Sequence, residues 1–246
     1  MASFGYRDVE EHEKPALVRG VFSSVAQRYD LMNDLMSGGV HRLWKDAMVE
    51  WLNPQPGQRI ADIAGGTGDI AFRIADLVRS RGGHAQIVVC DASIEMISEG
   101  IRRADEAEET DVHWICCDAE SLPVPDASMD ACTIAFGIRN VTHISRALTE
   151  ARRLLKPGGR FLCLEFSRVR APGLDALYER YSFAVLPRIG KLVAKDSDAY
   201  RYLAESIRRF PSQTAFTRMI ERAGLSRVKV RNLAGGIAAM HSAWRL

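Results

Sequence analysis

A glycine-rich turn with acidic flanks is the stretch of this sequence best suited to chemistry. It reads Gly65-Gly66-Thr67-Gly68, comes directly after an apolar run, and has Asp62 before it and Asp69 after it. Glycine lets a ligand approach the backbone closely and permits the positive φ of tight turns. The helical pattern at residues 70–78 adds N–H groups that lack backbone partners at its start. The pattern predicts a nucleotide-type cradle between a strand and a helix.

The spacing of the turn discriminates between nucleotide classes. A dinucleotide-binding turn usually reads G-x-G-x-x-G and places a pyrophosphate on the helix N-terminus, and this turn lacks that register. The carboxylates of Asp62 and Asp69 disfavour a pyrophosphate and suit a cation. S-adenosylmethionine carries a sulfonium and an ammonium group but no phosphate, so it is the expected ligand. A tight turn capped by Asp69 is the purely structural alternative.

Composition bounds the class of protein. The chain has 246 residues and 47% hydrophobic content, enough for a full core in one large domain. A net charge of +2 is too small to indicate that the chain as a whole attracts nucleic acid. No apolar run approaches a membrane span or the core of a signal peptide. The five cysteines lack C-x-x-C spacing, which indicates buried free thiols in a reducing, intracellular compartment.

Short apolar runs alternate with helical or turn-rich sequence in the middle of the chain. After the glycine turn they cover residues 87–91, 112–118, 129–136 and 160–166. This alternation predicts a mainly parallel sheet that is buried on both faces by helices. The segments at 228–233 and 238–244 predict an antiparallel hairpin at the sheet edge.

The flanking segments are expected to cover this sheet. Residues 1–12 look like a mobile lead, and helical patterns follow at 14–36 and 44–52. Residues 174–193 interleave apolar and basic side chains, as either a buried core helix or a lid that touches lipid or an apolar substrate does. We divide the single domain into an N-terminal helical cover (1–52), a cofactor-binding core (53–170), a helical lid or substrate region (171–223) and C-terminal strands (224–246).

Polar residues coincide with the carboxyl ends of the predicted strands, where ligands bind in open α/β sheets. Asp91 follows the second strand, where an acidic residue can accept both ribose hydroxyls. Asp118 and Ala119 follow the third strand, placed to meet the adenine amino group and ring edge. The structural alternatives are a helix cap for Asp91 and a turn cap for Asp118. Arg139 and Asn140 follow the fourth strand.

Several stretches resemble a known family. Asp62 to Asp69 looks like motif I of class I S-adenosylmethionine-dependent methyltransferases. More narrowly, the sequence resembles the ubiquinone/menaquinone biosynthesis C-methyltransferase family in Tyr29-Asp30-Leu31-Met32-Asn33-Asp34-Leu35-Met36-Ser37, His41-Arg42-Leu43-Trp44-Lys45, the glycine turn, Phe136-Gly137-Ile138-Arg139-Asn140-Val141, Tyr200-Arg201-Tyr202-Leu203, Ser206-Ile207 and Phe210-Pro211. The resemblance implies an α/β, Rossmann-like fold. Its mainly parallel seven-stranded sheet would have a C-terminal antiparallel strand and a helical insertion after strand five.

The resemblance also implies a set of cofactor contacts. These are Thr67, Asp91, Asp118 and Ala119, and Ala135 as a neighbour. The full set of expected cofactor-binding residues is Asp62, Gly65, Gly66, Thr67, Gly68, Asp91, Ala92, Asp118, Ala119 and Ala135. Asp118 stands where many members have Asn, so it can accept from the adenine amino group but cannot donate. Ala135 stands where the family has Ser, so it is expected only as a backbone neighbour.

The implied reaction is methylation of a ring carbon of a polyprenyl benzoquinol or naphthoquinol, namely 2-methoxy-6-polyprenyl-1,4-benzoquinol, demethylmenaquinol or both. The ring carbon becomes nucleophilic when the neighbouring hydroxyl loses its proton, so the site needs a group that stabilises a phenolate. Arg139, a poor base, is expected to stabilise the phenolate and orient a water, with a surface ion pair as the alternative. Asn140 is expected to hold the ring hydroxyl, and Tyr29 to contact the quinol or pack in the core. His241, on a predicted edge strand, is expected to be structural, with a catalytic position facing the site as the alternative. Methyl transfer from a sulfonium needs no metal.

Two other functions fit parts of the sequence. One is a catalytically silent S-adenosylmethionine-binding subunit of a quinone-biosynthesis assembly, against which Arg139 and Asn140 count. The other is a nicotinamide-dependent reductase, which the glycine spacing disfavours. We expect a cytoplasmic enzyme. Residues 174–193 are the candidate contact with the inner face of the membrane, where we expect reversible surface association and not insertion. Association with other quinone-biosynthesis enzymes and homodimer formation stay open.

Overall fold

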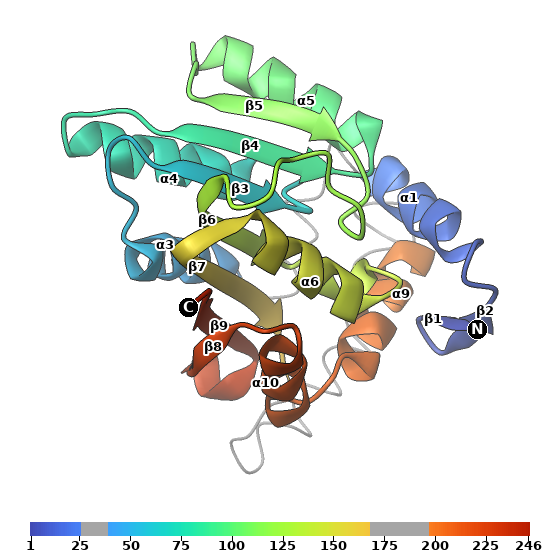
Figure 1. The fold of residues 1–246 in the computed structure, drawn as a ribbon. Helices are drawn as coiled ribbons and strands as arrows, with labels where there is room; N and C mark the ends of the chain where they lie inside the picture. The colour runs from blue at the N-terminus through green and yellow to red at the C-terminus, as the bar shows by residue number, and fades with distance from the viewer. Residues whose placement is uncertain (26–38, 168–196) are drawn as a thin grey trace.

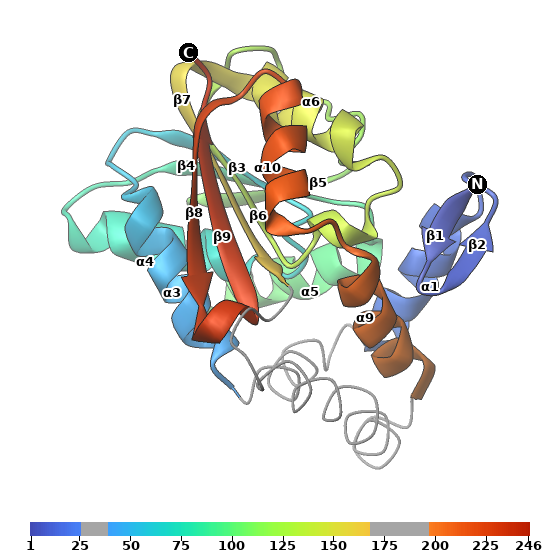
Figure 2. The same cartoon turned by 90° about the horizontal axis from the view of Figure 1, so that it is seen from below.

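The computed structural model describes residues 1–25, 39–167 and 197–246 (Figure 1). The predictions for Tyr29 and for residues 174–193 therefore lie outside the described residues. Within the described ranges the elements form one central sheet with helices on both faces (Figures 1 and 2).

The sheet has seven strands in the order β5-β4-β3-β6-β7-β9-β8. In chain order they are β3 (Arg59–Ile63), β4 (Gln86–Asp91), β5 (Val112–Cys116), β6 (Met129–Ala135), β7 (Leu155–Phe166), β8 (Ser226–Leu233) and β9 (Ala238–Trp244). The pairings from β5 through β7 are parallel, and β9 runs antiparallel to both β7 and β8. The predicted fold class, including the antiparallel C-terminal strand, is confirmed.

The C-terminal hairpin differs from the prediction in one respect. β9 lies between β7 and β8, so only β8 is an edge strand. Six of the seven residues of β9 are buried while most of β8 is exposed, which is the burial expected of an interior strand beside an edge strand. His241 therefore lies on an interior strand, where its ring packs edge-on against Phe216 with centroids 4.9 Å apart.

Helices on the two faces bury separate apolar clusters. One face carries α3 (His41–Leu52), α4 (Asp69–Ser80) and α9 (Ser197–Arg209), and the other carries α6 (Ile144–Leu154) and α10 (Gln213–Arg222). In α4 the buried residues recur at helical spacing, with an acidic residue in the first turn and a basic one in the last, as the helix dipole favours. α5 (Ile94–Glu106) approaches β5 closely at Gly100, where a Cβ would lie 2.6 Å from the Trp114 indole nitrogen.

The N-terminal residues are ordered, so the prediction of a mobile lead is wrong. β1 (Ala2–Phe4) and β2 (Arg7–Val9) form a small antiparallel sheet ahead of α1 (Lys14–Val25). The ring of Phe4 stacks on Tyr202 with centroids 4.4 Å apart. The backbone N–H of Tyr6 donates to the Glu205 carboxylate over 2.9 Å, across 199 positions of sequence. The sequence could not reveal this hairpin because its partner helix is so distant in the chain.

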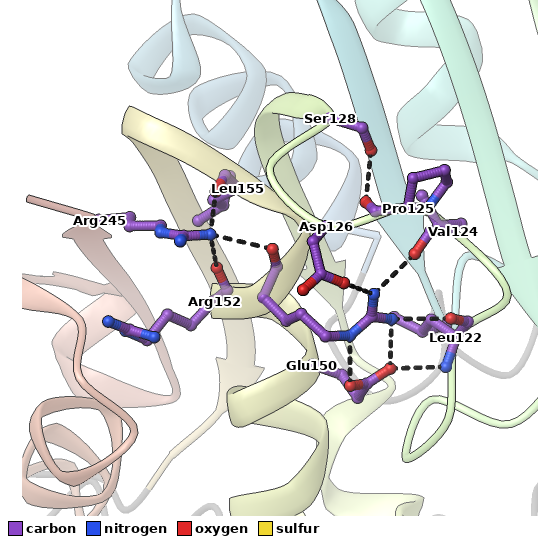
Figure 3. Close-up of polar contacts among 10 residues, drawn as sticks. Leu122, Val124, Pro125, Asp126, Ser128, Glu150, Arg152, Leu155 and Arg245 are labelled. Carbon is purple, nitrogen blue, oxygen red and sulfur yellow. Dashed lines mark hydrogen bonds and ion pairs between the residues drawn. The ribbon is translucent and has the colours of Figure 1, made fainter.

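The loop between β5 and β6, which contains Asp118, is bound to α6. Arg153 donates to the carbonyls of Leu122 and Val124 at 2.8 Å each and contacts Asp126 and Glu150 at 2.6 and 2.7 Å (Figure 3). Because one guanidinium satisfies two loop carbonyls and pairs with two carboxylates, the loop is held against α6.

Candidate active site

A cavity of about 300 Å³ opens at the carboxyl ends of β3 to β6. Nine of the ten predicted cofactor residues line it: Asp62, Gly65, Gly66, Thr67, Asp91, Ala92, Asp118, Ala119 and Ala135. Asn140 lines it as well. Gly68, the tenth, lies at the N-cap of α4, where its φ of 82° suits glycine. The predicted residues from four separate strand ends therefore meet in one cavity.

The glycine turn is closed tightly over β3. A Cβ on Gly65 would lie 2.5 Å from Oδ2 of Asp62, and Gly66 has a φ of 57°. The Gly66 N–H donates to Oδ2 of Asp91 over 2.9 Å, which ties the turn to the end of β4. Neither glycine position tolerates a side chain without a shift of the carboxylates or of the backbone.

Asp62 is fully buried, and only one of its two carboxylate oxygens has a hydrogen-bond partner among the described residues. Its Oδ1 accepts the hydroxyl of Thr133 over 2.7 Å, while Oδ2 has no hydrogen-bond partner among the described residues. Burial raises the pKa of Asp62 to about 7. A buried acceptor oxygen at a cavity wall suits a cationic donor such as an ammonium group.

Asp69 pairs with two cations of the protein, whereas the sequence predicted that it would face a cationic ligand. Its carboxylate pairs with Lys45 at 2.6 Å and with Arg73 at 3.1 Å. Burial acts to raise its pKa, but the neighbouring cations of Lys45 and Arg73 lower it below the ordinary value. Its charge is therefore compensated within the protein. The cap alternative is also wrong, because the N-cap residue of α4 is Gly68 and makes no side-chain cap bond.

Asp91 closes the opposite side of the turn. Its two carboxylate oxygens accept the N–H groups of Gly66 and Ser93, at 2.9 Å each. Burial raises the pKa of Asp91, and these backbone donors oppose the shift. Ser93, not Asp91, is the N-cap of α5, since its hydroxyl accepts from the Met96 N–H. The helix-cap alternative for Asp91 is therefore wrong.

Thr67 and Asp118 have partners that leave them able to bind a ligand. The Thr67 hydroxyl oxygen accepts from Arg103 over 3.0 Å, so its own hydrogen remains to be donated. Oδ1 of Asp118 accepts the Glu120 N–H over 2.9 Å. The turn-cap reading of Asp118 is thus correct, and it coexists with a position on the cavity wall.

Arg139 lies behind the cavity in a buried ion pair. Its guanidinium contacts the carboxylate of Glu165 at 2.8 Å and the carbonyl of Phe136, and the two charged side chains are 1% and 2% exposed. Burial raises the pKa of Glu165, against the opposing effect of Arg139. The surface ion pair considered for Arg139 is therefore wrong. Arg139 is not among the described residues that line the large cavity, and its role in stabilising a phenolate stays a prediction.

The sequence predicted no role for two residues at this site, Glu165 and Tyr202. Glu165 sits in the apolar run of β7, and a single carboxylate in such a run was the available signal. Tyr202 reaches Asn140 from α9, with its hydroxyl 3.1 Å from Oδ1. The short helix η2 (Ile138–Asn140), which carries Arg139 and Asn140, follows Phe136, whose φ is 57°. A positive φ at a bulky residue stores strain, which is common at functional sites.

The cysteines are all free, but two are not buried. Cys90, Cys132 and Cys163 are buried, whereas Cys116 is exposed and Cys117 is half-buried. The prediction of buried thiols therefore holds for three of the five. His241 is buried, and burial lowers its pKa to about 4, so it is neutral at physiological pH.

Comparisons with known proteins decide the family. Residues 7–245 match the ubiE/COQ5 methyltransferase family. The chain belongs to this family. The ubiquinone/menaquinone biosynthesis C-methyltransferase UbiE of Caulobacter vibrioides is 58% identical over 100% of this chain and 98% of its own length. The enzyme of the same name from Paracoccus denitrificans is 56% identical over 99% of this chain and 96% of its own length.

Solved structures support the fold. A SAM-dependent methyltransferase from Thermotoga maritima, described as a possible histamine N-methyltransferase, has a TM-score of 0.64 at 20% identity and covers 92% of this chain and 99% of its own. A SAM-dependent methyltransferase from Aquifex aeolicus has a TM-score of 0.62 at 15% identity, over 87% of this chain and 97% of its own. No helix within the described ranges is long and apolar enough to span a membrane.

The cavity fits S-adenosylmethionine, the cofactor of this methyltransferase. The half-satisfied Asp62 carboxyl suits its ammonium group, and Asp91 stands at the end of β4, where the ribose is held in folds of this type. Asp62 and Asp91 lie on opposite sides of the glycine turn, and the Gly66 N–H of that turn donates to Asp91. The two carboxylates therefore match the ammonium group and the ribose hydroxyls of the ligand.

Binding of S-adenosylmethionine should strengthen as pH rises through neutrality. Since the pKa of Asp62 is about 7, its carboxyl group ionises near neutral pH and then attracts a cation. We expect the affinity to rise up to about tenfold between about pH 6 and about pH 8. Isothermal titration across this range measures it. An Asp62→Asn variant should give a flat profile, whereas Asp118→Asn should keep the slope. A flat profile in the unmodified protein would contradict the assignment.

The same pKa shift acts on stability with the opposite sign. The folded-state pKa of Asp62 lies above its ordinary value of 3.8. Its contribution to the free energy of unfolding is therefore fully present below about pH 4 and is lost as pH rises through about 7. The ligand-free protein thus loses stability over the pH range in which its affinity for the cationic ligand increases.

Proposed function

We propose that this chain transfers the methyl group of S-adenosylmethionine to a ring carbon of a polyprenyl benzoquinol, a polyprenyl naphthoquinol or both, in ubiquinone and menaquinone biosynthesis. Relatives that carry this name match the chain over its whole length at 56% to 58% identity. The observation that carries the proposal is the position of Asn140, which lines the same cavity as Asp62 and Asp91. A polar side chain at the end of β6 can then meet a ring oxygen beside the bound cofactor.

Different residues bind different parts of the cofactor. S-adenosylmethionine, when bound, supplies a methyl group that its sulfonium already activates. Asp91 accepts the ribose hydroxyls, and Asp62 accepts the ammonium group. Asp118 accepts the adenine amino group, Ala119 and Ala92 contact the adenosine, and the Thr67 hydroxyl donates to the ligand. Ala135 offers only its backbone at this wall.

The residues on the substrate side position the ring and stabilise its oxygen. Asn140 holds the ring oxygen by hydrogen bonding, and a phenolate forms more readily where such donors are already oriented. Arg139 acts indirectly. By pairing with Glu165 and binding the Phe136 carbonyl, it fixes the backbone of η2 and with it the origin of the Asn140 side chain. Alignment of the ring carbon with the methyl group is then set by rigid elements.

A methyl-transfer assay tests the proposal directly. The purified chain, S-adenosylmethionine and a short-tailed benzoquinol or demethylmenaquinol should give a product heavier by one methylene group, together with S-adenosylhomocysteine. Mass spectrometry of both products measures the preference between the two rings. A chain that binds the cofactor but methylates neither quinol would contradict the proposal and favour the silent cofactor-binding subunit.

We infer that the enzyme is cytoplasmic and meets its substrate at the inner face of the membrane. A polyprenyl tail partitions into the bilayer, so a protein that acts on it gains from reversible surface contact. The same assay with substrate in anionic phospholipid vesicles tests this contact. Sedimentation of the protein with vesicles supports it, and equal turnover without any sedimentation would count against it.

A further inference from the structure

Tyr202 contacts Asn140 from behind the cavity. Its hydroxyl lies 3.1 Å from Oδ1 of Asn140, and the tyrosine is 5% exposed. Burial raises the pKa of Tyr202 to about 12, so the hydroxyl keeps its proton at neutral pH. Tyr202 lines a separate cavity of about 60 Å³, whereas Asn140 lines the large one. Among the described residues, the hydrogen bond to Asn140 is what connects Tyr202 to the large cavity.

This contact determines which atoms Asn140 offers to a substrate. A carboxamide has one acceptor oxygen and an NH₂ group with two donors. When the Tyr202 hydroxyl donates to the oxygen, the NH₂ group is the part left to serve the cavity. Donors aimed at a developing phenolate oxygen stabilise it, while an acceptor in the same place would repel it.

We propose that Tyr202 is a positioning residue, which holds the Asn140 carboxamide with its N–H donors toward the ring oxygen of the substrate. This inference rests on the function proposed above. It gives Tyr202 a role in the rate of methyl transfer and none in cofactor binding.

The N-terminal residues contact both Tyr202 and the backbone next to Asn140. The Phe4 ring stacks on Tyr202 at an interplanar angle of 23°, which restrains tilting of the phenol. The hairpin that carries Phe4 is itself held to α9 by Glu205 and Arg209. On the other side, the buried Lys14 ammonium donates to the carbonyl of Val141 over 2.9 Å, next to Asn140 in the chain. The asparagine is thus fixed at both its side chain and its backbone.

A Tyr202→Phe variant removes the hydroxyl and keeps the ring that stacks on Phe4. We expect kcat to fall about tenfold, the worth of one well-placed hydrogen bond, with KM for S-adenosylmethionine unchanged. The acid limb of the kcat profile should shift upward by about one pH unit, because the phenolate loses stabilisation of that size. Thr149→Val, which removes an exposed hydroxyl of α6 that donates to the Ser145 carbonyl, is the control and should behave as wild type.

A double-mutant cycle separates positioning from general packing. In an Asn140→Ala background, adding Tyr202→Phe should change kcat by less than about twofold, since the group through which it acts is gone. Asn140→Asp keeps the acceptor for Tyr202 but has no N–H donor, so its kcat should fall at least as far as that of Asn140→Ala. Wild-type turnover by Asn140→Asp, or the same tenfold loss from Tyr202→Phe in both backgrounds, would overturn the inference.

The outcomes for the inference and for the proposed function are distinct. Failure of the unmodified chain to methylate either quinol would overturn the function and the inference with it. An active wild type whose Tyr202→Phe variant is equally active overturns the inference alone.

Discussion

Replacing Asp91 by alanine is expected to weaken binding of S-adenosylmethionine by roughly 100- to 1000-fold, or about 3 to 4 kcal/mol. The carboxylate would hold two ribose hydroxyls by charge-assisted hydrogen bonds. It also accepts the N–H groups of Gly66 and Ser93, so its removal loosens the turn that shapes the cavity. Both effects act on binding and leave the buried core of the sheet in place.

Isothermal titration with S-adenosylmethionine, S-adenosylhomocysteine and NADH measures this effect. Asp105→Ala, at an exposed aspartate of α5, is the matched control and should bind as wild type does. An Asp91→Ala protein that binds S-adenosylmethionine within about threefold of wild type would remove the ribose assignment. Binding of NADH alone would revive the reductase reading.

Replacing Arg139 by alanine should lower the free energy of unfolding by about 3 to 5 kcal/mol, the usual cost of leaving one partner of a buried ion pair uncompensated. The Glu165 carboxylate would stay in the core, where burial already raises its pKa. A raised pKa gives a stabilising contribution that is present at low pH and lost as pH rises. The deficit of the variant should therefore grow toward alkaline pH.

Urea denaturation at several pH values tests this expectation. The double variant Arg139→Leu/Glu165→Leu should recover most of the loss, because neither of these buried charges then remains. Arg102→Ala removes an exposed arginine that pairs with Glu99 and should cost little. An Arg139→Ala protein as stable as wild type, or a double variant less stable than the single one, would contradict the prediction.

The sequence revealed the cofactor side of the site better than the substrate side. Asp62, Asp91 and Asp118 each stand at the end of a strand, and the parallel order of strands brings strand ends together. Local pattern was therefore sufficient to predict that they share a cavity. The pairing of Asp69 with Lys45 was not visible, because it depends on how α3 packs against α4.

The substrate side depends on contacts between distant segments. Arg139 finds Glu165 on the next strand, and Asn140 finds Tyr202 after an intervening stretch of 61 residues (141–201). No periodicity or spacing encodes such pairs: Glu165 stands out as a carboxylate in an apolar run, but nothing in the run indicates that Arg139 is its partner. The prediction that residues 1–12 are mobile was wrong for the same reason. The strand that carries Phe4 has three residues and gains its stability from a partner elsewhere in the chain.

The interior position of β9 makes the sheet depend on a strand that follows the other six in the chain. Within the described part of the chain, β8 pairs with β9 alone. Until β9 has formed, β7 leaves one edge open over residues Arg160–Phe166, most of which are buried in the finished fold. Such an edge is a template for pairing with other chains. The final strand thus both completes the sheet and protects it from aggregation.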